Sequence, residues 1–352
     1  MIKRSFFMLT PPRLTYDLLE ANPKEPESIP VPTHLTLLVN QPLDSEKSLL
    51  IQKGNAVKKG EKLCLYADST EYAVSPVSGT INDIDVYLDH FGNQATRIVI
   101  EAAKTQAGIV ADPCELAEAI GSADACLRTL PGAPPLKALA RKDAKINTLV
   151  VTCTDGDLLS TTNQYLALRH TDDIKAGALL LKKLAGATKV CITVPDQLDI
   201  KGNFDGMQVF KISSPYPGHL PAMILKNHLN MELPAGKKPE DIGVCFVSAE
   251  AAAAMANAYQ TRMPDFEKIV TIIGKQGSRY RVKATIGTPL QKIFDVLNIH
   301  VNDQDRLVIN GPMQGVTTYT LFHPVQPDMD TVIVQDRDTI AEVSDTACVN
   351  CG

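Results

Sequence analysis

Two cysteines near the end of the chain, Cys348 and Cys351, have the spacing that most directly suggests chemistry. Two residues between thiolates allow both sulfurs to bind one metal ion or one iron of a cluster. A four-iron cluster needs four ligands, and the sequence ends at Gly352. The pair is either the start of an iron–sulfur motif, continued in a longer chain or completed from elsewhere, or two unused thiols in a solvated tail.

A polar loop with two carboxylates follows the short apolar run at residues 149–151. Asp155, Gly156 and Asp157 would lie at the carboxyl end of a parallel strand, where open α/β sheets bind ligands. Carboxylates at such a position can accept hydrogen bonds from ribose or ring hydroxyls. The alternative is an ordinary polar loop.

Two other loops could contact a ligand: Leu130–Pro135, which contains Gly132, and Pro215–His219, which contains His219. A single glycine such as Gly132 is a poor cradle for phosphate, which needs successive backbone N–H groups. No strand is followed by Gly-x-Gly-x-x-Gly, and the sequence contains no P-loop. His219 is a candidate ligand residue or, alternatively, an ordinary surface or core histidine.

The elements that would position these loops alternate between strand and helix from residue 106 to residue 262. Because the apolar strands do not alternate with polar residues, they predict a buried parallel sheet in a Rossmann-like α/β domain. The expected strands are 149–151, 190–194, 208–212 and 243–247, and the expected helices are 171–184, 221–229 and 248–259. A helical link is expected before them, from about residue 106 to residue 145.

Residues 46–105 are expected to form a separate β domain. Glycines at turn positions divide short apolar runs, as in Gly54–Leu63 and Ser75–Ile81. The pattern resembles the barrel-sandwich hybrid fold of biotinyl and lipoyl carriers. Those carriers need a lysine at a hairpin tip, and no lysine occurs between Lys62 and Lys104. We therefore expect a scaffold or docking domain.

Residues 263–328 predict a third unit, a small β-grasp domain. Two strands at 268–273 and 280–286 are followed by a capping-box helix start at Thr288 and a strand at 306–309. Residues 1–45 are proline-rich and are expected to be extended and irregular. Residues 329–352 form a tail. The expected fold class is thus α/β plus β.

Composition excludes several classes of protein. The chain has 352 residues, 44% of them apolar and 21% charged, which is typical of two or three globular domains. Its net charge of −5 argues against nucleic-acid binding. No run reaches the roughly 20 apolar residues of a membrane span, so a transmembrane segment is not expected. Scattered cysteines in so long a chain indicate a reducing cytoplasm rather than a disulfide scaffold.

The order of these elements resembles the C subunit of the Rnf electron-transport complex. The resemblance covers about residues 45–352, and its specific motifs include Ser75–Thr80, Thr285–Leu290 and Arg306–Gly315. The pair Cys348 and Cys351 matches the opening of the family's ferredoxin-like motif. The A subunit of the sodium-pumping NADH:quinone reductase and the flavin-binding subunit of complex I are similar as well.

This resemblance implies a cytoplasmic electron-transfer subunit, peripheral on the inner face of the cell membrane, whose partners are other subunits of a membrane redox complex. Electrons would pass from NADH through FMN to 4Fe-4S clusters. Cys348 and Cys351 would be cluster ligands. The cofactor loops would be those of Gly132, of Asp155, Gly156 and Asp157, and of Gly218.

The cofactor loops depart from the family's pattern. The family's Gly-x-Gly-Gly-x-Gly-Phe-Pro appears here as Cys126–Pro135, where Gly132 is the only glycine, and its Glu-x-Glu-Pro appears as Asp155–Leu158. FMN and NADH binding therefore stay open. One alternative is a non-catalytic docking subunit that has lost both ligands, and a second is a soluble flavoprotein of the cobalamin-reductase type.

Overall fold

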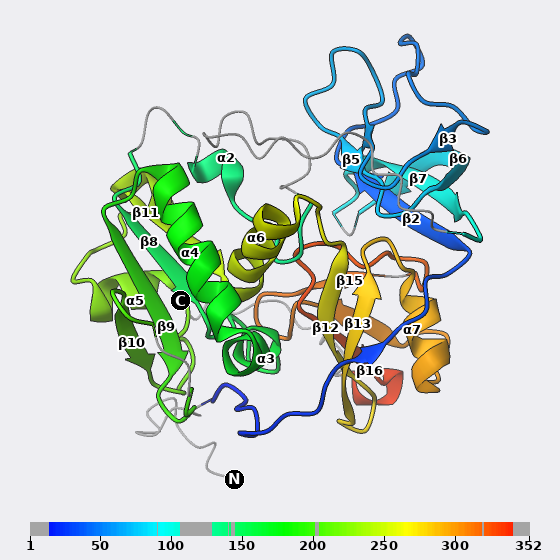
Figure 1. Cartoon of the computed structure of the whole chain (residues 1–352). Coiled ribbons are helices and arrows are strands. Elements are labelled where there is room, and N and C mark those ends of the chain that lie inside the picture. The colour runs from blue at the N-terminus through cyan, green and yellow to red at the C-terminus, as the bar shows by residue number, and fades with distance from the viewer. Residues whose placement is uncertain are drawn as a thin grey trace, which may run out of the picture.

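The computed structural model describes residues 14–89, 91–105, 129–139, 141, 145–200, 204–318 and 320–340. Three lobes are apparent in Figure 1: a parallel sheet covered by helices, a larger mixed sheet, and a small β domain. Most of the expected helical link, residues 106–128, lies outside the described residues.

The small β domain contains a four-stranded sheet in the order β2-β7-β6-β3 and a hairpin of β4 and β5. The strands are β2 (His34–Val39), β3 (Ala56–Val57), β4 (Lys62–Leu63), β5 (Ala73–Val74), β6 (Gly79–Leu88) and β7 (Gln94–Ala102). The domain boundary predicted at residue 46 is too late, because β2 pairs with β7 from His34 to Val39. Leu35 and Leu37 fill the core of this domain, although prolines flank the strand.

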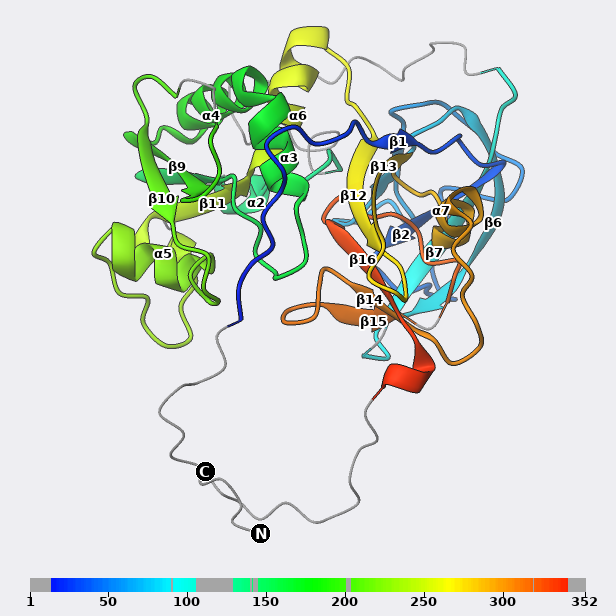
Figure 2. The ribbon, with the colours of Figure 1, turned by 90° about the horizontal axis from the view of Figure 1, so that it is seen from below.

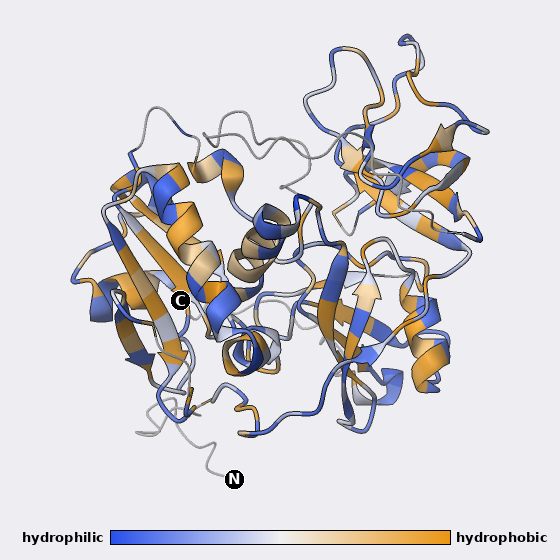
Figure 3. Ribbon diagram, viewed as in Figure 1, coloured by the Kyte–Doolittle hydropathy of each residue, from blue (hydrophilic) through white to orange (hydrophobic). Residues whose placement is uncertain are grey.

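The second domain has the predicted parallel sheet, in the order β10-β9-β8-β11. Its strands are β8 (Thr148–Thr152), β9 (Lys189–Pro195), β10 (Gln208–Ile212) and β11 (Val244–Ser248). All four expected strands are confirmed within one or two residues. Figure 3 shows hydrophobic residues concentrated in these strands, in keeping with a sheet buried on both faces.

Helices cover both faces of the parallel sheet (Figure 2). One face packs on α3 (Thr162–Arg169), α4 (Thr171–Ala185) and α6 (Ala249–Thr261), and the other on α5 (Pro221–His228). The short elements are α2 (Leu136–Leu139) and η1 (Pro239–Ile242). Helices α4 and α6 approach closely at Gly177, where a Cβ would overlap the carbonyl of Ala252. As predicted, the Ser248 hydroxyl caps α6 by accepting the N–H of Ala251.

The third lobe is a six-stranded sheet in the order β1-β13-β12-β16-β14-β15. Its elements are β1 (Glu27–Ser28), β12 (Glu267–Ile273), β13 (Arg279–Thr285), α7 (Leu290–Leu297), β14 (Arg306–Ile309), β15 (Val316–Thr318), β16 (Thr331–Gln335) and η2 (Arg337–Thr339). The capping box expected at Thr288 is wrong, because α7 begins after Pro289 without a side-chain cap. The boundary at residue 328 is too early, since β16 lies inside the sheet.

Residues 14–33 form an extended segment, here called the N-terminal strap. It pairs with the α/β domain at Thr15 and with the six-stranded sheet through β1. Figure 2 shows the strap running from the α/β domain to β13, beside which its β1 forms the edge of the sheet. The extended conformation was expected, but the contacts with both large domains were not.

Within the described residues, no helix combines the length and the apolarity that a bilayer crossing requires.

Candidate functional site

Asp155, in the loop after β8, is almost completely buried and holds the first turn of α3. Its carboxylate accepts the backbone N–H of Asn163 at 2.9 Å and of Gln164 at 3.4 Å. The Gln164 amide and the Ser160 hydroxyl donate to it at 3.1 and 3.2 Å. Burial raises the pKa of Asp155 to about 6, against the lowering effect of these donors. Both carboxylate oxygens are therefore used in stabilising the loop.

Asp157 joins this loop to the six-stranded sheet. Its carboxylate accepts the N–H groups of Met313 at 3.0 Å and Gln314 at 2.7 Å. The Gln314 amide also donates to the carbonyl of Gly156 at 2.8 Å. Gly311 has a φ of 98°, and a Cβ there would overlap the Asp157 carboxylate. The aspartate thus binds a neighbouring glycine loop of the chain itself, as a backbone "nest" binds an anion.

Gly132 is packed against the beginning of α6. A Cβ at Gly132 would overlap the backbone nitrogen of Ala251 and the hydroxyl of Ser248. The Gly132 N–H donates to the Pro327 carbonyl at 2.8 Å. Only glycine fits at this close approach to α6 and at a φ of 78°. The loop at Gly132 therefore covers the first turn of α6.

Gly218 closes a turn that positions His219. The Gly218 N–H donates to the Pro215 carbonyl at 2.9 Å, and a Cβ would lie only 3.0 Å from that oxygen. His219 Nδ1 lies 3.0 Å from the carbonyl oxygen of Asp155. The structure therefore brings the Gly218 and Asp155 loops together, with buried His219 as the link.

A buried ion cluster at the boundary of the two large domains was not predicted. The Lys268 side chain, on β12, is fully buried and bonds Glu250 at the start of α6. It also donates to Asp330 at 2.7 Å. Burial favours neutral lysine, but the Asp330 and Glu250 carboxylates outweigh it and raise the pKa of Lys268. The only sequence signal was a lysine placed directly before the apolar run Ile269–Ile273.

The predicted cofactor residues do not fit a flavin in this arrangement. Every carboxylate oxygen of Asp155 and Asp157 already accepts a hydrogen bond from the chain. At Gly132, the space beside the α6 terminus that a phosphate would need is filled by backbone. These loops hold the domains together, and no chemical step can be derived through FMN at these residues.

The predicted cluster ligands Cys348 and Cys351 lie outside the described residues. Across the described ranges there is no group of three or more histidine, cysteine, aspartate or glutamate side chains arranged to hold a metal ion. The described cysteines are free thiols: Cys153, Cys191 and Cys245, which are buried, and Cys64, which is partly exposed.

Comparison with known proteins gives one matching family domain. Residues 19–105 match the RnfC barrel sandwich hybrid domain. The match begins within the N-terminal strap and includes β2, in agreement with the strand pairing of the small β domain.

Similarity to curated proteins extends over nearly the whole chain. The C subunit of a proton-translocating ferredoxin:NAD(+) oxidoreductase complex from Clostridium ljungdahlii is 22% identical, with 93% of this chain and 76% of that protein covered. The C subunit of an ion-translocating oxidoreductase complex from Serratia proteamaculans is 25% identical, over 92% of this chain and 49% of that protein. The corresponding C subunit from Methanosarcina acetivorans is 24% identical, over 86% and 74%. The chain thus spans about half the length of some relatives and three quarters of others.

Among solved structures, an NAD+-reducing [NiFe]-hydrogenase in the air-oxidized state superposes with a TM-score of 0.42 at 15% identity, covering 64% of this chain and 47% of that chain. A likeness of this size adds nothing to the assignment.

A barrel-sandwich hybrid domain, joined to a parallel α/β domain and a mixed sheet, places the chain in a class of multidomain α/β-plus-β proteins. Within that class, the matching domain and the curated relatives confirm the resemblance to the C subunits of Rnf-type ion-translocating oxidoreductase complexes.

Proposed function

We propose that this chain is an electron-transfer subunit of an Rnf-type membrane redox complex, linked to NADH and to iron–sulfur clusters. The observation that carries the proposal is the similarity to the C subunits of such complexes over more than nine tenths of the chain. The partners would be the other subunits of such a complex, with this subunit peripheral on the inner face of the membrane. The six-stranded sheet with α7 would be its β-grasp domain.

Cys348 and Cys351 would supply two thiolates to a 4Fe-4S cluster, in keeping with their spacing. Such a cluster would pass single electrons between a donor and the membrane subunits. The name of one relative gives ferredoxin as the electron donor and NAD(+) as the acceptor. NADH would be the donor when electrons flow in the reverse direction.

A second candidate function is a docking subunit that has lost FMN and NADH binding at the family's loops. The observation that favours it is the use of Asp155, Asp157 and Gly132 in internal packing. In this case the chain would connect partners, and its only redox group would be the cluster at Cys348 and Cys351.

Purification from detergent-solubilised membranes tests membership of the complex. A tagged full-length chain is expected to co-purify with integral membrane subunits, flavin and iron, and its deletion to abolish NADH-dependent electron transfer in those membranes. Recovery of the chain without membrane subunits, together with unchanged electron transfer in the deletion strain, would overturn the proposal.

An anaerobic titration of the isolated chain with FMN and then NADH separates the two candidates. Flavin binding followed by bleaching would favour the NADH-oxidising subunit. A folded chain that leaves flavin fluorescence unchanged would favour the docking subunit.

A further inference from the structure

Tyr16 of the N-terminal strap lies flat on the imidazole of His219. The two ring centroids are 3.6 Å apart and the ring planes differ by 7°. Both side chains are buried, with 4% of Tyr16 and 3% of His219 exposed. The stack lies beside the Asp155 loop, because His219 contacts the Asp155 carbonyl. A planar ring supplied by the strap therefore occupies the carboxyl end of the parallel sheet, where this fold class places ligands.

The ring is held by contact area rather than by polar bonds. Within the described part of the chain, the Tyr16 hydroxyl and His219 Nε2 are buried without a hydrogen-bond partner. Buried polar groups in native structures nearly always have a hydrogen-bond partner. Two unpaired polar atoms in one ring stack therefore require an explanation. A ligand ring carrying donors and acceptors at its edge would satisfy polar atoms that the phenol ring leaves unpaired.

The backbone of the strap would attach without these side chains. Tyr16 N–H donates to the Ser214 carbonyl at 2.9 Å, and Asp17 N–H donates to the Leu158 carbonyl at 2.8 Å. Tyr216 N–H donates to the Leu14 carbonyl in the same way. Any extended peptide can make such backbone hydrogen bonds. Attachment of the strap therefore does not explain why position 16 has an aromatic side chain.

The residue after Tyr16 supplies an anion. The Asp17 carboxylate forms an ion pair with Arg279 of β13. A ring on His219 followed at once by a negative charge on an arginine has the chemical order of a nucleotide, a base followed by phosphate. Arginine is well suited to such a phosphate because its guanidinium donates two parallel hydrogen bonds.

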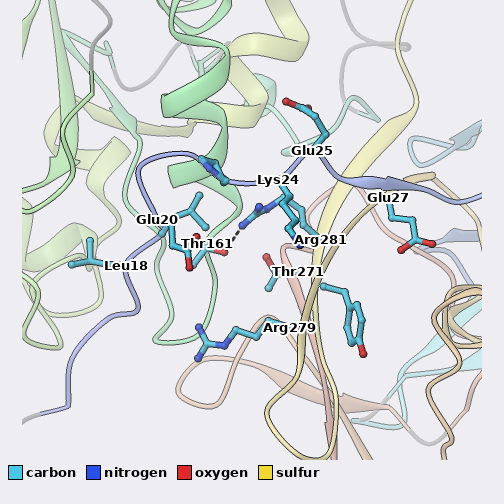
Figure 4. A pocket seen from close by; sticks show the side chains of 12 residues that line it. Leu18, Glu20, Lys24, Glu25, Glu27, Thr161, Thr271, Arg279 and Arg281 are labelled. Carbon is cyan, nitrogen blue, oxygen red and sulfur yellow. Dashed lines mark hydrogen bonds between the residues drawn. The ribbon is translucent and has the colours of Figure 1, made fainter.

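A cavity of about 550 Å³, lined on the sheet side by Arg279 of this ion pair, lies between the strap and the sheet. Figure 4 shows Arg279, Arg281 and Lys24 around it, with Arg281 directed toward Thr161, and Glu20, Glu25 and Glu27 on the strap side. The Arg281 guanidinium donates to the Thr161 hydroxyl at 3.0 Å and lies over the ring of Tyr165. Its Nε is buried and unpaired within the described residues. The wall opposite the strap is therefore positive and has an unused donor.

We propose that Tyr16 and Asp17 mimic a nucleotide. Displacing this part of the strap would open a groove from His219 past Arg279 to the cavity at Arg281, and this groove would bind the ring and phosphate of a nucleotide such as NADH. The choice of NADH rests on the proposed function, whereas the groove and its mimic rest on the contacts above. Through His219 the position shares the predicted Gly218 loop, but it does not use the Gly132, Asp155 and Asp157 loops, which stay engaged in packing.

Single and double variants of the full-length chain test the groove directly. Tyr16→Ala removes the internal competitor and is expected to increase NADH affinity about tenfold or more, measured by calorimetry. Tyr16→Phe keeps the ring and is expected to bind NADH as weakly as the native chain. Arg279→Gln or His219→Ala, added to Tyr16→Ala, is expected to remove the gain. Tripolyphosphate, which has no ring, should not gain from Tyr16→Ala.

Hydrogen exchange on the native chain supplies an independent readout if Tyr16→Ala does not fold. Saturating NADH is expected to speed exchange of the Tyr16 and Asp17 N–H groups, because the strap must leave. A folded Tyr16→Ala chain with native NADH affinity, or one that binds p-cresol but not NADH, would overturn the proposal. So would unchanged exchange in the native chain at saturating NADH.

These outcomes do not depend on assembly. Failure of the chain to co-purify with membrane subunits contradicts the proposed function. NADH binding at the groove can still be measured on the isolated chain in that case. An unresponsive groove in a chain that does co-purify contradicts only this inference.

Discussion

Lys268 lies fully buried between the two large domains, with its ammonium group bonded to the carboxylate of Glu250. Asp330 accepts a second bond from the same ammonium at 2.7 Å. The lysine belongs to β12 and Glu250 begins α6, so the bond fixes one domain on the other. Burial raises the pKa of Glu250 to about 7, although the lysine lowers it. The carboxylate thus needs the ammonium beside it to stay ionised.

Removing the lysine should be costly. Lys268→Met leaves the buried Glu250 carboxylate beside the partly exposed Asp330 carboxylate without a counter-charge. We expect a loss of about 3–5 kcal/mol in the free energy of unfolding. Chemical denaturation measures this loss. The matched control is Lys283→Met, which breaks the partly exposed pair with Glu267 and should cost about 1 kcal/mol or less. Equal losses in the two variants would contradict the role assigned to the buried cluster.

His219 should make the strap sensitive to acid. Burial lowers the pKa of His219 from 6.5 to about 4, so the folded state releases a proton that the unfolded state keeps between these values. Its contribution to stability is full above about pH 6.5 and is lost as the pH falls toward 4. The surrounding titratable groups are Tyr16, Tyr216, Asp155 and Asp196. Hydrogen exchange of the Tyr16 N–H should therefore quicken, relative to the intrinsic rate, between pH 6.5 and 4. His219→Phe, which cannot titrate, should remove this acceleration. It should leave only the opposite trend from Asp155, whose raised pKa of about 6 stabilises the folded state as the pH falls toward 4. Acceleration that persists in the variant would assign it to another group.

The parts of the fold that local sequence determines were predictable. The four apolar strands of the parallel sheet, the Ser248 cap and the turn at Gly54 follow from patterns within a few residues, and the structure has them. Helix α3 was missed because Thr162–Arg169 follows a polar loop and its capping carboxylate, Asp155, lies seven residues upstream of its first residue. The strand β2 was hidden by its proline-rich flanks.

The candidate site was predictable in part. The predicted parallel sheet places the Asp155 and Gly218 loops, which each follow a strand, at its carboxyl edge, and in the structure His219 links them. The partners of Asp157 lie more than 150 positions later in the sequence. Lys268 pairs with Glu250 on α6 and with Asp330, which directly precedes β16. Such contacts depend on how the domains pack, which no pattern within one segment encodes.

Asp157 should govern the order of the glycine loop at residues 311–315. Asp157→Ala leaves the N–H groups of Met313 and Gln314 without their acceptor, at an expected cost of about 1–3 kcal/mol. Hydrogen exchange at these two residues should accelerate more than elsewhere in the sheet. Asp303→Ala, at an exposed position, is the control and should leave both amides unchanged. Protection that survives in Asp157→Ala would mean that the loop is held by other contacts.

Gly311 offers a test of the same contact from its other side. Gly311→Ala and Gly206→Ala both place a side chain at positive φ, 98° and 80°. Only at Gly311 would the Cβ overlap another residue, the Asp157 carboxylate, whereas nothing lies within 4 Å at Gly206. We expect Gly311→Ala to be less stable than Gly206→Ala by about 1–3 kcal/mol, the usual cost of overpacking, in thermal or denaturant unfolding. Equal destabilisation would leave only the shared backbone strain as the cause.

Cys348 and Cys351 provide the test of the iron–sulfur assignment. Their two-residue spacing allows both thiolates to bind one cluster, so anaerobic reconstitution of the chain with iron and sulfide should give the absorption of thiolate-bound iron. Cys348→Ser and Cys351→Ser should each lose most of the bound iron, because two ligands already fall short of the four that a four-iron cluster requires. Cys64→Ser removes a partly exposed thiol of the small β domain and should keep the iron content of the native chain. If all three variants hold the same iron as the native chain, or if the native chain holds none, the pair is not a cluster site in this chain, and the electron-transfer role would lose the redox group that the sequence assigns to it.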